Sequence, residues 1–146
     1  MIDKRKFNGG NRNAGRKKGV GIAFDIKKNC EAFIIELLKD DAIKNKAIKD
    51  VEDSLFKDKK EDFLYIIENQ GLYKIGYTSN FVNRYKNYKS HLGIVNLVYL
   101  HKGFDTYLLE DKLHVVFKEK RKTGEWFDLS KKEILHCVKT CSETLI

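Results

Sequence analysis

The sequence predicts an α+β fold: a small, mainly antiparallel three-stranded sheet with a short extra strand, flanked by helices and preceded by a basic arm and a helical extension. Segments rich in β-branched and aromatic residues alternate with segments of helical periodicity in the second half of the chain. Hydrophobic residues make up 42% of the 146 residues, which suffices for a buried core.

Composition also narrows the class of protein. No apolar run approaches the ~20 residues of a membrane span, and the first residues contain no signal-peptide core. The three cysteines cannot all pair within one chain, so no disulfide scaffold is expected. We therefore expect an intracellular, cytoplasmic protein in a reducing compartment, with no membrane partner.

Residues 1–21 are expected to form a flexible basic arm that binds DNA. Residues 1–20 contribute +6 to the chain's net charge of +8, and glycines are interspersed among the bases. Such an arm can follow a DNA groove, where neutralised phosphates release condensed counterions. A solubilising tail is the alternative interpretation. The residues expected to contact DNA are Arg5, Arg12, Arg16, Lys17 and Lys18.

Residues 22–58 are predicted to form a helical extension. Apolar residues recur at helical spacing over 23–40, where Asp25 is a candidate N-cap, and every four residues over 40–56. These segments are two helices or one broken helix. They either pack on the core domain or form a dimer surface, and the sequence does not decide between the two. The charged segment 57–62 is interpreted as a linker.

The third unit, residues 63–146, begins with a predicted β-hairpin whose strands are FLYIIE and LYKIGY. A loop with an even number of residues around Asn69-Gln70 pairs Tyr65 with Lys74. Strand alternation then places Tyr65, Lys74 and Gly76 on one face, and the glycine lets another group approach the backbone. The opposite, apolar face contains Leu64, Ile66, Tyr73 and Ile75.

The elements after the hairpin alternate between helix and strand. Thr-Ser-Asn offers caps for the first helix, Asp105 is expected to cap the second, and Ser130 with Glu133 forms a capping box for the last. The predicted elements are a helix over 81–91, a strand over 94–100, a helix over 105–121, a short strand over 124–129 and a helix over 130–141.

Two polar residues on the predicted helices are candidates for a metal ligand and for a phosphate-binding group. Glu110 interrupts a mostly apolar helix stripe, where a divalent cation would compensate the cost of a buried carboxylate. Arg84 lies four residues before Tyr88 on one helix face, a position from which a guanidinium can hold a phosphate. His114 faces near Glu110 and is a candidate to orient this carboxylate without binding the metal itself.

The combination of a tyrosine, an arginine and a carboxylate on a basic chain points to phosphodiester hydrolysis. Water must lose a proton, the arginine stabilises the added negative charge, and a metal assists the leaving oxygen. Taken singly, each residue also fits an ordinary structural role: Tyr65 as a strand aromatic, Arg84 as an exposed charge and Glu110 as a salt-bridge partner.

The segments FLYIIENQGLYKIGYTSNFVNRYKNY and LLEDKLHVVFKEKRKTGEWFDLS resemble the GIY-YIG endonuclease superfamily. Within it they resemble the phage and fungal branch with K-I-G and a late G-E-W-F, whose members are often described as DNA-binding domains. The resemblance covers roughly residues 63–136. It implies a small antiparallel sheet flanked by helices, and cleavage of DNA with one divalent ion, Mg²⁺ or Mn²⁺.

The resemblance also implies roles for single residues. Tyr65 matches the tyrosine that activates water, Arg84 the arginine that stabilises the phosphate, and Glu110 the glutamate that binds the metal. Tyr88 occupies the position four after the arginine, and Gly76 is the glycine of the second motif. The main departure is Lys74, which stands where the second motif has its tyrosine.

Three functions remain in competition at this point. The first is a metal-dependent DNA endonuclease that acts on double-stranded DNA, and a dimer is compatible with it. The second is a catalytically silent DNA-binding module on the same fold, and the third is a protein-interaction or nuclease-inhibiting protein. The set Tyr65, Arg84 and Glu110 favours the first, Lys74 favours the second, and the basic arm argues against the third.

Overall fold

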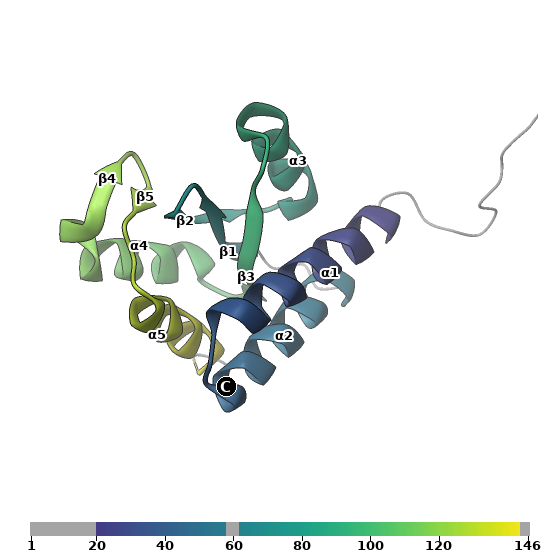
Figure 1. The fold of residues 1–146 in the computed structure, drawn as a ribbon, viewed down its shortest axis with the longest axis horizontal. Helices are drawn as coiled ribbons and strands as arrows, with labels where there is room; N and C mark the ends of the chain where they lie inside the picture. Colours follow the sequence, from purple (N-terminus) through teal and green to yellow (C-terminus); the bar gives the residue numbers. More distant parts are fainter. Residues whose placement is uncertain (1–19, 58–61, 144–146) are drawn as a thin grey trace, which may run out of the picture.

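The computed structural model describes residues 20–57 and 62–143, in which five α-helices flank one five-stranded antiparallel sheet (Figure 1). This confirms the predicted α+β fold, with two short strands where one was expected. The sheet order is β3-β1-β2-β5-β4. The strands are β1 Asp62–Asn69, β2 Leu72–Thr78, β3 Asn96–Gly103, β4 Arg121–Thr123 and β5 Trp126–Phe127.

The helices are α1 Val20–Leu37, α2 Asp41–Phe56, α3 Phe81–Leu92, α4 Thr106–Val116 and α5 Lys131–Ser142, with a short 3-10 turn at Lys118–Lys120. None of the helices in the described ranges is long and apolar enough to cross a membrane. The predicted DNA-contacting residues of the arm and most of the predicted linker lie outside the described residues.

Helices α1 and α2 lie side by side and pack against β3, at one edge of the sheet (Figure 1). Their buried side chains, among them Ile34 of α1 and Val51 of α2, belong to the same core cluster as the central strands. The structure corrects the cap of α1, because Asp25 lies inside this helix and the helix begins earlier, at Val20. Asp40 caps α2 by accepting a hydrogen bond from the Ile43 amide at 3.1 Å.

The β1–β2 hairpin turns through two residues, Gln70 and Gly71, both with positive φ (52° and 84°). This is the backbone of a two-residue hairpin turn, which matches the twist of the strands. Tyr65 therefore pairs with Gly76 and not with Lys74, a correction of two positions. A shift by two leaves the faces unchanged, so Tyr65, Lys74 and Gly76 still share one face, as predicted.

Strand β1 is the centre of the fold. Its four residues Leu64–Ile67 are successive and buried, so both faces of the strand are covered. The helices that hold the candidate site, α3 and α4, contact β1, and α4 also contacts β2. The site is therefore built on the two central strands, whereas α1 and α2 pack at the β3 edge.

Local capping explains where the later helices begin. Asn80 caps α3 by accepting from the Asn83 amide at 3.2 Å, and the predicted capping box of Ser130 and Glu133 is present at α5. Asp105 instead has a positive φ of 59° and makes no side-chain cap. Helix α4 also ends earlier than predicted, since the residues that follow it pair with β5 as β4.

Candidate active site

Tyr65 is buried in the middle of β1, 1% exposed, with its ring against Phe81 and Tyr88 of α3 at centroid distances of 5.6 and 6.0 Å. Its partner across the hairpin is Gly76. A Cβ atom placed on Gly76 would lie 2.5 Å from the Tyr65 hydroxyl oxygen and 2.6 Å from its ring carbon. The glycine of the second motif therefore makes room for the tyrosine of the first.

The hydroxyl groups of Tyr65 and Tyr88 are joined by a hydrogen bond of 2.7 Å. Burial raises the pKa of the Tyr65 phenol far above its usual value, and the bond to Tyr88 raises it further. Tyr65 therefore stays protonated at neutral pH. Tyr88 is only half-buried and lines an open hollow, so it is the tyrosine of this pair that a ligand can meet.

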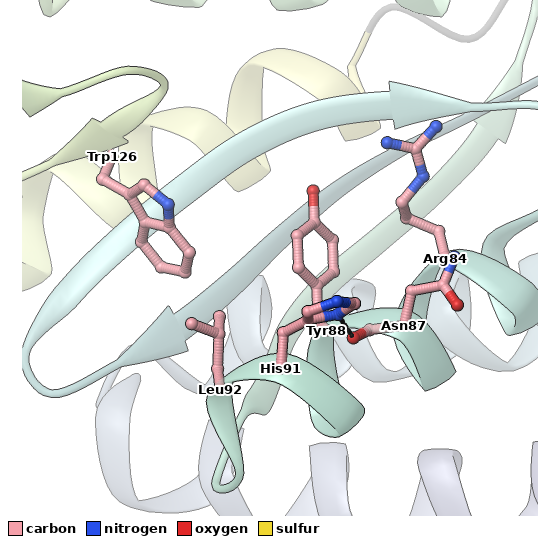
Figure 2. A pocket seen from close by; sticks show the side chains of 6 residues that line it. All are labelled: Arg84, Asn87, Tyr88, His91, Leu92 and Trp126. Atoms are coloured by element: carbon pink, nitrogen blue, oxygen red, sulfur yellow. Dashed lines mark hydrogen bonds between the residues drawn. The ribbon is translucent and has the colours of Figure 1, made fainter.

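The hollow has a volume of about 370 Å³, and α3 forms most of its wall. Figure 2 shows Arg84 at one end, Trp126 and Leu92 at the other, and Tyr88 between them. The Arg84 side chain is exposed and forms no ion pair within the described ranges. The lining residues are Arg84, Asn87, Tyr88, His91, Leu92 and Trp126.

Lys74 connects this hollow to a group of acidic residues. Its Nζ atom lies 3.2 Å from an oxygen of Glu125, in the turn between β4 and β5. The same atom lies 5.7 Å from the ring centroid of Tyr88 and 5.8 Å from that of Trp126, within cation–π range. The side chain of Lys74 thus faces the site, and its charge is partly compensated by a carboxylate.

Glu110, His114 and Glu125 each offer a ligand atom, and these atoms lie within 4.8 Å of one another. Glu110 and His114 are four residues apart on α4, so they share one face of the helix. Burial raises the pKa of the Glu110 carboxyl, an effect that His114 opposes. A buried carboxylate beside a second one is costly unless a cation compensates it.

The orientation of His114 fits the role of a ligand. Its Nε2 atom lies 2.7 Å from the carbonyl oxygen of Ile75. Since a carbonyl oxygen only accepts, Nε2 must donate, which leaves the lone pair of Nδ1 free in the neutral ring. Metal-binding histidines are commonly fixed in this way. Two carboxylates and one imidazole form a donor set that fits a divalent cation, and the nitrogen suits Mn²⁺ better than Mg²⁺.

The structure thus brings together the predicted residues Tyr65, Lys74, Arg84, Tyr88 and Glu110. Glu125 was not predicted as a site residue, although residues 124–129 were predicted to form a short strand. The sequence offered one indication of Glu125, namely an acidic residue in an otherwise basic segment. Its proximity to Glu110, however, depends on the pairing of Trp126 with Lys74, which brings β5 to the site.

Comparison with known families gives a match to the T5orf172 domain over residues 62–142. The matched range includes the whole sheet, helices α3 to α5 and all of the site residues described above. The same comparisons found no match among curated proteins and none among solved structures.

Proposed function

We propose, from the premise that this chain belongs to the T5orf172 domain family and so to the GIY-YIG-like nuclease fold, that it is a metal-dependent endonuclease for double-stranded DNA. The observation that supports this proposal is a row of neighbouring residues: Arg84 and Tyr88 line one hollow, Lys74 lies near Tyr88 and pairs with Glu125, and Glu125 lies close to Glu110. A phosphate-binding group, a hydroxyl relay and a set of metal ligands are adjacent in it. These are the groups that phosphodiester hydrolysis needs.

Arg84 is the residue that we assign to the scissile phosphate. Its guanidinium is exposed at the end of the hollow, with no ion pair among the described residues to compete for it. The planar fork of a guanidinium matches two oxygens of a phosphate and stabilises charge that grows during the reaction. Lys74, whose ammonium faces the same region, adds a second positive charge.

The tyrosine pair is assigned to the attacking water. Because Tyr65 stays protonated, it donates its hydrogen bond to the Tyr88 oxygen in the arrangement that we propose. The Tyr88 hydroxyl then retains its own proton and one lone pair for a water molecule in the hollow. Tyr65 acts in this scheme as the group that orients Tyr88, and Tyr88 positions the attacking water through a hydrogen bond.

Glu110, Glu125 and His114 are the residues that would hold one Mg²⁺ or Mn²⁺ ion. When bound, such an ion acts as a Lewis acid that stabilises negative charge on the leaving oxygen. The protein's own contribution is to hold a buried carboxylate, Glu110 on α4, close to the partly exposed carboxylate of Glu125 in the turn before β5.

Incubation of supercoiled plasmid with the protein and Mn²⁺ is expected to produce nicked circles. Arg84→Ala should lower the nicking rate by roughly 10²- to 10³-fold, the usual effect of removing one donor to a developing oxyanion. Lys118→Ala, an exposed basic residue outside the hollow, is the control and should cut at the wild-type rate. Nicking by Arg84→Ala at the control rate would contradict the assigned role.

A catalytically silent DNA-binding module is the second candidate. Lys74 supports it, because a lysine replaces the second-motif tyrosine and pairs with Glu125. Assignment to the K-I-G branch of the superfamily is also supported by two short motifs, K-I-G at Lys74-Ile75-Gly76 and G-E-W-F at Gly124–Phe127. Salt-sensitive DNA binding by the wild type, without nicking in Mg²⁺ or Mn²⁺ on any DNA, would favour this candidate over the nuclease.

The N-terminal arm, which lies outside the described ranges apart from its last residues, is proposed to add affinity for duplex DNA. Deletion of residues 1–19 is expected to weaken binding to every sequence and to flatten the plot of log affinity against log salt. The slope should fall by about 0.9 for each phosphate that the arm neutralises. An unchanged slope after the truncation, measured by titration at several salt concentrations, would exclude phosphate contacts by the arm.

A further inference from the structure

We infer that the Trp126 end of the hollow is a pocket for a single unpaired nucleobase, next to the phosphate that Arg84 holds. This inference rests on the proposed function and names the class of substrate: DNA in which one nucleotide beside the cleavage site is free of its partner.

The walls at this end are apolar and aromatic. Trp126 of β5 is partly exposed, and Leu92 is 40% exposed at the end of α3. Figure 2 shows the two side chains on the same side of the hollow, with the Tyr88 ring between them and Arg84. A planar base that enters here meets an indole face, and base–aromatic stacking does not depend on which base it is.

The polar groups suit the edge of a base. The side-chain amide of Asn87, which offers both donors and an acceptor, makes no hydrogen bond within the part of the chain that the structure describes. The Nδ1 atom of His91 donates to the Asn87 carbonyl oxygen at 2.8 Å, so Nε2 of the neutral ring is an acceptor. Donors and acceptors are thus available beside the aromatic wall.

The position of the hollow limits what fills it. Arg84 and Trp126 line one continuous space, with Tyr88 between its two ends. A DNA strand whose phosphate is at Arg84 has its nearest base within one nucleotide of that point. In a paired duplex this base is stacked and hydrogen-bonded inside the helix, so it reaches a pocket on the protein only when it is unpaired or flipped out.

The test uses the fact that Trp126 is the only tryptophan in the chain. Two labelled duplexes of equal length, one fully paired and one with a single-nucleotide bulge, are titrated with the full-length protein in a metal-free buffer. The bulged DNA is expected to bind roughly 5- to 150-fold more tightly, the range of one base–aromatic stack. It should also quench Trp126 emission, whereas the paired duplex should quench it much less.

Variants at two leucines of similar exposure, together with one at Asn87, separate the pocket from general binding. Leu92→Ala, at the wall of the hollow, should reduce the preference for the bulge, and so should Asn87→Ala. Leu108→Ala removes the same side chain from α4, where it is 50% exposed and outside the hollow, and should retain the preference. Equal affinity for both duplexes and equal quenching would overturn the pocket.

These experiments distinguish failure of the base-pocket proposal from failure of the endonuclease proposal. Nicking of plasmid together with equal binding of the two duplexes overturns the base pocket and leaves the endonuclease. Selective binding of bulged DNA without any nicking supports the pocket and contradicts the endonuclease. Absence of binding to both DNAs overturns both proposals.

Discussion

Glu110→Gln is expected to lower the nicking rate by about 10³-fold while leaving the affinity for DNA nearly unchanged. The amide has the shape of the carboxyl but no negative charge, so it does not hold a divalent ion between His114 and Glu125. Loss of a Lewis acid that stabilises the leaving oxygen removes several kcal/mol of transition-state stabilisation. Nicking and DNA binding are measured on the same preparations, with Mn²⁺ present.

The stability of the same variant provides a second measurement. Burial raises the pKa of the Glu110 carboxyl in the folded protein above its value in the unfolded chain, so folding disfavours the charged carboxylate. This loss of stability is present above the folded-state pKa and disappears as the pH falls below the unfolded-state value. Without metal, Glu110→Gln should therefore melt at a higher temperature than wild type at pH 7, and the difference should vanish in acid.

Added Mn²⁺ should reverse the order of the two melting temperatures, so that the wild type melts above Glu110→Gln. At a concentration of 100 times its dissociation constant, an ion that binds only the folded state stabilises it by about 2.7 kcal/mol. The wild type should show this stabilisation and Glu110→Gln should not. Glu119→Gln, at an exposed position outside the cluster, is the matched control and should behave as wild type in all three assays. Full nicking activity in Glu110→Gln would contradict the metal site.

The side of the hairpin on which the site lies could be predicted because a strand alternates with a period of two. Apolar Leu64 and Ile66 define one face, so Tyr65 and Lys74 lie together on the other for any loop with an even number of residues. The register itself was missed by two positions. The turn is centred on Gln70-Gly71, where the glycine supplies the positive φ that such a hairpin requires.

Glu125 and strand β4 could not be predicted in the same way. Strands β4 and β5 have only three and two residues, too few for a periodic pattern to emerge above chance. Their place in the sheet depends on the pairing of Trp126 with Lys74, two residues far apart in the chain. Contacts of this kind depend on packing that no local signal encodes, and they complete the acidic group around Glu110.

Gly76 was predicted to let another group approach the backbone, and the structure identifies that group as the Tyr65 ring. Gly76→Ala is expected to lower the free energy of unfolding by about 1–3 kcal/mol, the usual cost of overpacking a buried position. It should also displace Tyr65 from Tyr88 and slow nicking. Urea denaturation, with the slope compared between variants, measures the first effect.

A double-mutant cycle tests whether a clash with the Tyr65 ring causes the loss of stability in Gly76→Ala. In a Tyr65→Leu background the space beside Gly76 is free, so Gly76→Ala should be nearly neutral, which corresponds to a coupling energy of about 0.5–3 kcal/mol. Gly71→Ala is the control: nothing lies within 4 Å of its added methyl group, but its φ of 84° strains an alanine. That strain costs about 1–2 kcal/mol and should persist with Leu at position 65. If Gly76→Ala slows nicking without destabilising the fold, the glycine instead serves the approach of the substrate.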